Sequence, residues 1–430
     1  MFLTGRAVVL TAVGAIAVLL APAVTTAWLW LGLVALACAV DALLAANPRA
    51  AVITRDTTAS VRLGEPARST LTVQHPGPRT LRAHVRDAWV PSAGATANRH
   101  RVTVPAGERR RVATALRPTR RGRREADLVT LRATGPLGLS GRQASLEVPG
   151  TVLVLPPFHS RRHLPSRLAR LREMDGRTAV LVRGQGTEFD SLREYVIGDD
   201  VRSIDWRATA RAGDVVVRTW RPERDRRVLV VVDTGRLSAV RLGDETRLDA
   251  QIEAALLLAT LASHAGDRVD VVALDTEVRA RVAGQTGPRL MSGLATGLAD
   301  VEPALAETNW TRVAAVVRES LSQRALVVLL TALEPANLGN GLLATAQALA
   351  RDHTVVVASA VDPAVARLVE DRSDTDALYR AAAAERAALE REAAETRLRH
   401  RAVEVVEAPA ADLPPDLADT YLRLKRAGRL

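Results

Sequence analysis

The chain has 430 residues, of which 47% are hydrophobic and 25% are charged. This balance excludes general disorder and leaves room for two or three domains, each with its own core. The formal net charge of +11 is carried almost wholly by arginine, since Lys425 is the single lysine. Basic clusters such as Arg109–Arg111 lack interleaved aromatic residues, so we expect no nucleic-acid partner. Cys38 is the only cysteine, which excludes an internal disulfide.

An uncharged apolar stretch extends from Ala7 to Val40. One membrane-spanning helix needs about 20 apolar residues, so this stretch is long enough for two helices. Because Pro22 interrupts the stretch near its middle, we predict one helix over residues 6–23 and a second over residues 27–46. Together they would form a transmembrane hairpin within residues 1–48.

Basic residues flank this hairpin on the same side of the membrane. Arg6 precedes the first helix, Arg49 and Arg55 follow the second, and the loop between the helices has no charge. The positive-inside rule then places both ends in the cytoplasm, which predicts a multi-pass protein of the cell membrane with cytoplasmic soluble domains. A signal peptide cleaved after residues 21–23 is the alternative, and the second apolar segment would then still hold the chain in the membrane.

Residues 49–157 have the pattern of an all-β domain. Short alternating stretches recur, such as residues 69–73 (STLTV) and 100–104 (HRVTV), and turn-forming residues separate them, as at residues 64–66 (GEP). Strands spaced 8–12 residues apart are typical of a β-sandwich of the immunoglobulin or fibronectin type.

From residue 227 to residue 430 the pattern changes to alternating strands and helices. Continuous apolar runs at residues 228–233 (VLVVVD), 325–331 and 353–361 indicate buried parallel strands. Helices are expected over residues 248–264, 311–322, 338–351, 376–400 and 416–426, a strand pair over 267–275 and 277–282, and a short strand over 403–406. This alternation predicts a doubly wound, Rossmann-like α/β domain.

Residues 158–226 are predicted to be a polar connector that contains one dense motif. Residues 186–211 have the sequence GTEFDSLREYVIGDDVRSIDWRATAR, in which six acidic residues and four arginines accompany three aromatic residues. Such a mixture favours a network of charge-assisted hydrogen bonds. Three roles remain open: a clamp between the connector and the sheet, a surface for a protein partner, or carboxylate-based catalysis, for which the motif shows no clear nucleophile or metal cage.

The motif resembles the signature of the bacterial domain-of-unknown-function 58 family. The residues that carry this resemblance are Glu188, Phe189, Arg193, Glu194, Tyr195, Gly198, Asp199, Asp200, Arg202, Asp205, Trp206 and Arg211. The order of apolar helices, β-rich region with residues 135–139 (GPLGL), motif and α/β domain also resembles the family. The resemblance implies a membrane-anchored protein with a von Willebrand factor A-like domain, and a hexameric AAA+ ATPase of the MoxR type as its partner.

The same resemblance raises the question of a metal site. Von Willebrand factor A domains often bind Mg²⁺ through an Asp-x-Ser-x-Ser loop, but here Gly235 and Leu237 stand at the two serine positions after Asp233. Ala332 stands where a second aspartate is expected, and Glu334 is out of register to take the place of that aspartate. Asp233, Ser238 and Thr331 therefore form a degenerate candidate site, which we expect to bind Mg²⁺ weakly or not at all; no other cofactor is expected.

The sequence contains no GxxxxGK[ST], HExxH, CxxC or GxSxG motif. We therefore expect a membrane-anchored scaffold or adaptor, not an enzyme. The family resemblance implies that it presents its α/β domain to the ATPase during assembly or maturation of envelope or other complexes. The alternative is a carboxylate- or metal-dependent hydrolase that uses the motif region.

Overall fold

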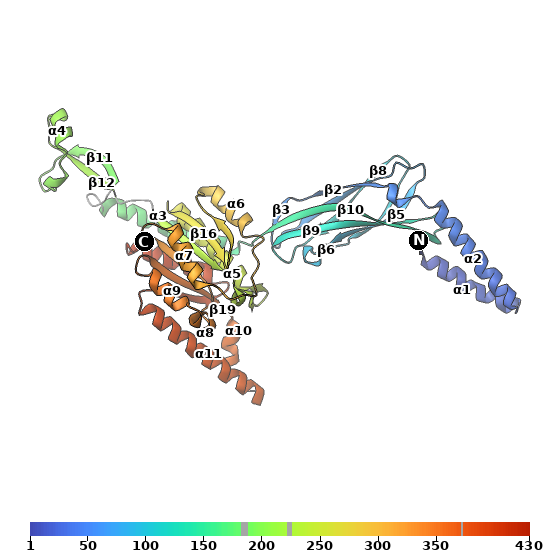
Figure 1. Cartoon of the computed structure of the whole chain (residues 1–430). Coiled ribbons are helices and arrows are strands. Elements are labelled where there is room, and N and C mark those ends of the chain that lie inside the picture. The colour runs from blue at the N-terminus through green and yellow to red at the C-terminus, as the bar shows by residue number, and fades with distance from the viewer. Residues whose placement is uncertain (182–187, 222–225, 371–372) are drawn as a thin grey trace. The chain divides into compact units, whose positions relative to one another are not determined.

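The computed structural model describes residues 1–181, 188–221, 226–370 and 373–430 (Figure 1). Contacts between Cα atoms divide the chain into two compact units, Met1–Pro157 and Phe158–Leu430.

The first unit begins with two apolar helices, α1 (Gly5–Leu20) and α2 (Val24–Leu44). The segment Val24–Ala50, which starts with α2, is long and apolar enough to cross a membrane. The 16 residues of α1 are also apolar, but they extend only about 24 Å, less than the roughly 30 Å hydrocarbon core of a bilayer. The two helices pack closely because the ring of Trp30 lies against Gly14, where a Cβ atom would come within 2.1 Å of it.

The first unit also contains two sheets, which share two clusters of buried residues. The first contains β1 (Phe2–Leu3), β10 (Ser140–Leu155), β9 (Gly122–Thr134), β5 (Leu81–Trp89) and β7 (Arg99–Val104), with β3 (Ser60–Arg62) beside β10. The second has the order β2 (Val52–Thr57), β4 (Ala67–Gln74), β8 (Arg109–Leu116) and β6 (Ala95–Thr96). Alternate residues of each sheet, such as Leu71 and Leu131, are fully buried in one of these clusters. The prediction of a β-rich region is confirmed.

A charged pair is buried inside this β-rich region. The Arg55 guanidinium contacts the Asp87 carboxylate at 2.6 Å, and the two side chains are 1% and 0% exposed. The indole nitrogen of Trp89 donates to the same carboxylate at 3.1 Å, and Arg55 also donates to the carbonyl of Val148 at 2.9 Å. Good geometry and extra hydrogen bonds offset the cost of removing both charges from water.

The end of α2 is joined to the loop between β9 and β10. Asp41 is fully buried, and its carboxylate accepts hydrogen bonds from the amides of Leu137, Leu139 and Ser140 at 2.7, 2.7 and 2.9 Å. Gly135 allows this approach, because a Cβ atom there would lie 2.2 Å from an Asp41 oxygen. The GPLGL sequence thus forms a carboxylate-binding loop.

The second unit contains a six-stranded sheet with the order β17-β16-β13-β18-β19-β20. These strands are β13 (Arg227–Asp233), β16 (Arg268–Leu274), β17 (Val278–Val282), β18 (Leu326–Leu330), β19 (Thr354–Val361) and β20 (Glu404–Pro409). All neighbours are parallel except β16 and β17, which are antiparallel. The predicted mixed α/β architecture is confirmed.

Helices cover both faces of this sheet, because its strands are apolar on both faces. Val230 of β13 packs in one cluster with residues of α3 (Leu164–Leu181), α5 (Arg247–His264), α6 (Gly287–Gly297) and α12 (Leu413–Arg426). Leu229 packs on the opposite face with residues of α7 (Trp310–Ser320), α9 (Leu342–Leu349) and α11 (Thr375–Arg399).

Some predicted elements were wrong. The single helix expected over residues 338–351 is two helices, α8 (Pro335–Gly339) and α9, because Gly341 adopts φ +111° between them. The helices α6 and α10 (Pro363–Glu370) were not predicted. The expected connector contains α3, which packs on the α/β core through Leu164 and Leu171.

Candidate functional site

The dense motif folds into a separate small hairpin. Its strands β11 (Glu188–Glu194) and β12 (Val216–Arg221) form a two-stranded antiparallel sheet, and α4 (Trp206–Ala212) lies in the connection between them. We call residues 188–221 the motif hairpin. The backbones of Glu188 and Phe189 pair with those of Arg221 and Trp220. Both Glu188 and Phe189 belong to the predicted motif, but their side chains lie outside the part of the chain that the structure describes.

One ion pair closes the first turn of the motif hairpin. The Arg193 guanidinium contacts the Asp199 carboxylate at 2.6 Å, and the amide of Val196 donates to the same carboxylate at 3.0 Å. The hydrogen bond from Arg193 lowers the pKa of Asp199. Gly198 adopts φ +111°, which the turn requires and which other residues rarely adopt.

Asp205 organises the second half of the motif hairpin. Its carboxylate caps α4 by accepting the amides of Arg207 and Ala208 at 3.0 Å each, and it also accepts from Arg218 of β12 at 2.8 Å. The hydrogen bond from Ala208, followed by that from Arg218, lowers the pKa of Asp205. The carboxylate therefore joins the helix to the sheet.

The other predicted motif residues do not converge on one point. Asp200 accepts the amide of Arg202 at 2.9 Å, and Tyr195 is held through its backbone by Val215. Glu194, Arg202 and Arg211 have exposed side chains. Among the described residues of the motif, Asp199, Asp200 and Asp205 thus have separate partners.

The motif hairpin exposes apolar side chains, of which the sequence analysis had named only Trp206. Ile197 is 96% exposed and Trp206 is 69% exposed. Val196, Val201 and Leu192 are also exposed. Their exposure could have been suspected from the sequence, since these apolar residues lie among the charged residues that make the hairpin's internal contacts. We call these five residues the apolar surface of the motif hairpin.

The second candidate site lies at the carboxyl end of β13. Asp233 is 2% exposed, and its carboxylate accepts hydrogen bonds from the amide of Gly235 at 2.8 Å and the hydroxyl of Thr331 at 2.5 Å. The hydroxyl of Thr308 also donates to it. Ser238 donates to the backbone carbonyl of Asp233 instead of its carboxylate. Burial raises the pKa of Asp233 above its usual value.

These residues do not fit a divalent metal. Both carboxylate oxygens of Asp233 already accept from hydroxyl or amide donors, and the threonine hydroxyls would have to turn their lone pairs inward to bind a cation. Within the described residues no group of three or more His, Cys, Asp or Glu side chains could hold a metal. The hollow beside Thr308 measures about 10 Å³, and the ion-paired Arg236 and Glu307 contribute to its lining.

The glycine in place of the first expected serine has a steric reason. A Cβ atom at Gly235 would lie 2.2 Å from the hydroxyl of Thr308, so the serine and this arrangement of Thr308 exclude each other. Thr308 was not identified from the sequence, because it lies in the loop between α6 and α7, 75 residues from Asp233.

Arg247 connects the loops at the same edge of the sheet. Its guanidinium is nearly buried and donates to the carbonyls of Leu237 and Ala360 at 2.9 and 3.1 Å, and to the carboxylate of Glu334 at 3.1 Å. Glu334 therefore points to an arginine rather than to Asp233. The guanidinium thus joins the segments after β13 and β18 to the end of β19.

The family model described as "Protein of unknown function DUF58" matches residues 191–408. The uncharacterized proteins Mb1516 of Mycobacterium bovis and Rv1480 of Mycobacterium tuberculosis are each 27% identical over 186 residues. The matched region covers 43% of this chain and 57% of each relative, so the chain spans little more than half the length of these relatives.

Among solved structures, the β-rich region is similar to the CARDB domain of PF1109 from Pyrococcus furiosus. That match has 13% identity and a TM-score of 0.18, and covers 24% of this chain and 87% of that domain. A FixG-related protein from Vibrio parahaemolyticus matches with 11% identity and a TM-score of 0.18, covering 24% of this chain and 96% of that chain.

Proposed function

Because the chain belongs to the DUF58 family, whose function is unknown, we propose its function from its geometry: it is a membrane-anchored adaptor whose motif hairpin binds a protein partner. The observation that carries this proposal is the apolar surface of that hairpin.

A two-stranded hairpin is marginally stable in water unless another surface covers it. The motif hairpin nevertheless has a fixed internal geometry, because Arg193 pairs with Asp199 and Asp205 pairs with Arg218. Ile197 and Trp206 are left outside these contacts. Exposed apolar side chains gathered in one short segment of the chain favour an interaction site. Tryptophan is enriched among the residues that contribute most to binding.

For the anchor, we propose that α1 and α2 cross the membrane as a hairpin with both ends in the cytoplasm. Arg6 and Arg49 flank the pair, while Ala21–Ala23 between the helices has no charge. Local thinning of the bilayer, or snorkelling of flanking residues such as Arg6, would accommodate the shorter α1.

For the α/β domain, we propose a von Willebrand factor A-like module, supported by the parallel sheet with Asp233 at the carboxyl end of β13. The family resemblance makes a MoxR-type AAA+ ATPase the first partner to test. The hydrolase alternative has less support, because Asp199 and Asp205 are already held by arginines and backbone amides.

The test is site-specific photocrosslinking of the full chain in native membranes. A photoreactive amino acid at position 197 should crosslink to an AAA+ ATPase, and Trp206→Ala should abolish that product. The control is the same photoreactive amino acid at position 305, where Leu305 is 87% exposed outside the hairpin.

Three outcomes would contradict the adaptor role. Crosslinks from position 197 only to this same chain would make the hairpin an internal clamp. Equal capture from positions 197 and 305 would show non-specific contact. Unchanged capture by a folded Trp206→Ala variant would remove the apolar surface from the binding site.

A further inference from the structure

The last strand of the six-stranded sheet has a free edge. β20 pairs in parallel with β19, from Val356 with Glu404 to Val361 with Pro409, and no other strand of the described residues pairs with it. An edge strand presents unpaired backbone N–H and C=O groups, which proteins normally protect and which an extended peptide can use.

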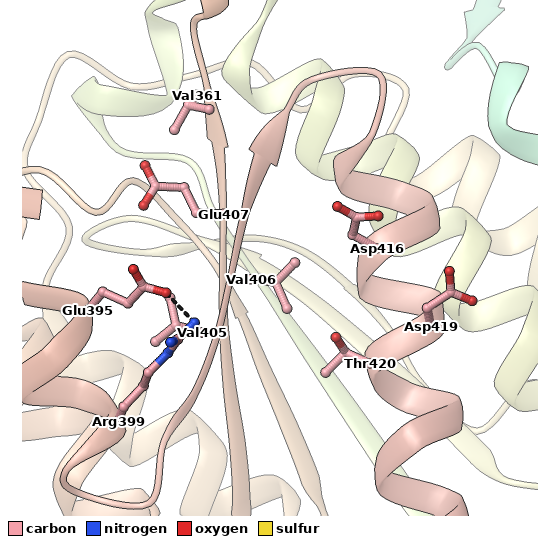
Figure 2. Close-up of a pocket in the computed structure, with 9 residues that line it drawn as sticks. All are labelled: Val361, Glu395, Arg399, Val405, Val406, Glu407, Asp416, Asp419 and Thr420. Carbon is pink, nitrogen blue, oxygen red and sulfur yellow. Dashed lines mark ion pairs between the residues drawn. The ribbon is translucent and has the colours of Figure 1, made fainter. Parts of the chain in front are cut away.

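A groove of about 610 Å³ lies over this strand, between α11 and α12 (Figure 2). That volume falls within the roughly 300–1,000 Å³ of ordinary ligand sites. Val405 and Glu407 point to the α11 side of the strand, whereas Val406 points to the α12 side. The free backbone edge of β20 and both of its side-chain faces therefore line one open groove.

The α12 wall of the groove carries a carboxylate with little compensation. Asp419 is paired with Arg167 and Arg170 at 2.6 and 3.2 Å. Asp416 has no such ion pair in the described structure, and burial together with the neighbouring Asp412 and Asp419 raises its pKa, which Arg167 offsets only in part. A cation arriving at Asp416 would relieve this repulsion.

The α11 side of the strand carries a second carboxylate, which is only weakly paired. Glu395 is paired with Arg399 at 2.5 Å, whereas the ion pair of Glu407 of β20 with Arg391 is longer, at 3.7 Å. Burial raises the pKa of Glu407; the charge of Arg391 opposes this shift in part, and the charge of Glu395 adds to it. Asp416 and Glu407 therefore lie on opposite sides of β20 and each favours a positive neighbour (Figure 2).

We propose that this groove binds an extended segment of a partner protein, which adds to β20 as a further strand and places two adjacent basic side chains on Asp416 and Glu407. Successive side chains of a strand point to opposite faces, so one basic residue reaches each wall only when the two are neighbours in sequence. The flanking residues of the segment are small or apolar, to match Val405 and Val406. This inference does not rest on the proposed role of the motif hairpin.

The probe is a blocked, fluorescent hexapeptide, Thr-Val-Arg-Arg-Val-Thr, added to the purified full chain in lipid nanodiscs. We expect saturable binding that Asp416→Asn and Glu407→Gln each weaken by about tenfold, as the loss of a charge-assisted contact predicts. Glu302→Gln, a substitution of an exposed acid in another loop, should leave binding unchanged. Hydrogen exchange of the amides of residues 404–408 should slow when the peptide binds.

Two altered peptides separate strand addition from simple charge attraction. The peptide Thr-Arg-Val-Arg-Val-Thr has the same composition but places both arginines on one face, and N-methylation removes the backbone donors of the original. Both should bind at least about tenfold more weakly. Equal binding of either one overturns the proposal, as does absence of binding of the original at about 1 mM.

Two other occupants would also overturn it. Displacement of the peptide by millimolar Mg²⁺ or Ca²⁺ would identify the acidic walls as a cation site. Dimers of the full chain that protect the β20 amides without peptide would show that a second copy covers the edge.

Discussion

The carboxylate of Asp41 accepts the backbone amide of Leu139 at 2.7 Å, across 98 residues of sequence. It joins the last turn of α2 to the loop before β10, so the apolar helices and the β-rich region share a rigid connection. A buried carboxylate needs several donors, and the amides of Leu137 and Ser140 provide the others.

Replacing Asp41 by alanine should destabilise the first unit by about 3 kcal/mol, because three buried amides lose their acceptor. The measurement is thermal unfolding of the full chain in nanodiscs, with limited proteolysis after residue 134. Asp56→Ala is the matched control, since Asp56 is an exposed aspartate on β2. Equal effects of the two substitutions would contradict the prediction.

The Arg55–Asp87 pair should be costly to break on one side only. Asp87→Leu leaves a buried guanidinium without its counter-charge, Arg55→Met does the same to the carboxylate, and for each we expect a loss of about 3–5 kcal/mol in unfolding free energy. The double variant Arg55→Met/Asp87→Leu should be more stable than either single variant. Denaturant unfolding of all four proteins tests this as a double-mutant cycle. Additive losses would show that the charges act independently.

Asp233 should make stability depend on pH. Burial raises the pKa of its carboxyl in the folded state above the usual 3.8, so the protonated form favours folding. Its contribution is present in full below the unfolded-state pKa and is lost as pH rises through the folded-state pKa. Melting temperature should therefore fall more steeply with rising pH above 3.8 in the wild type than in Asp233→Asn. Parallel pH profiles would refute this assignment.

Arg247→Lys should destabilise the α/β domain by about 3 kcal/mol, although the charge is kept. One ammonium group cannot reproduce the fork that contacts Leu237, Glu334 and Ala360. The measurement is the free energy of unfolding of the second unit, residues 158–430, obtained by denaturant unfolding of the chain. Arg241→Lys is the control, because Arg241 is exposed and donates to the backbone carbonyl of Asp244 at 3.0 Å.

Asp205→Ala should loosen the motif hairpin without unfolding the α/β domain. It removes the cap of α4 and the contact with Arg218 together, so amides of residues 206–212 should exchange several-fold faster. Asp214→Ala, a change of an exposed aspartate in the same hairpin, is the control. Global loss of protection would instead make the hairpin part of the domain core.

Much of the architecture followed from local pattern. The uncharged stretch at residues 7–40 indicated apolar helices, and the runs at residues 228–233 and 325–331 indicated buried strands of a sheet covered on both faces. These predictions succeeded because periodicity and hydrophobicity act within one element. Short elements such as α6 and α10 were missed, since segments of 11 and 8 residues contain too few turns to show a clear helical period.

The candidate sites were only partly accessible to sequence. The charged motif at residues 188–211 was enough to identify the family, and the replacement of two serines after Asp233 was visible in the chain. The folded arrangement was needed to find that Thr308 and Thr331 enclose Asp233, that Glu334 turns to Arg247, and that β20 leaves an edge between two helices. Hydrogen-bond partners far apart in the chain are chosen by how the elements pack, and no local pattern records that choice.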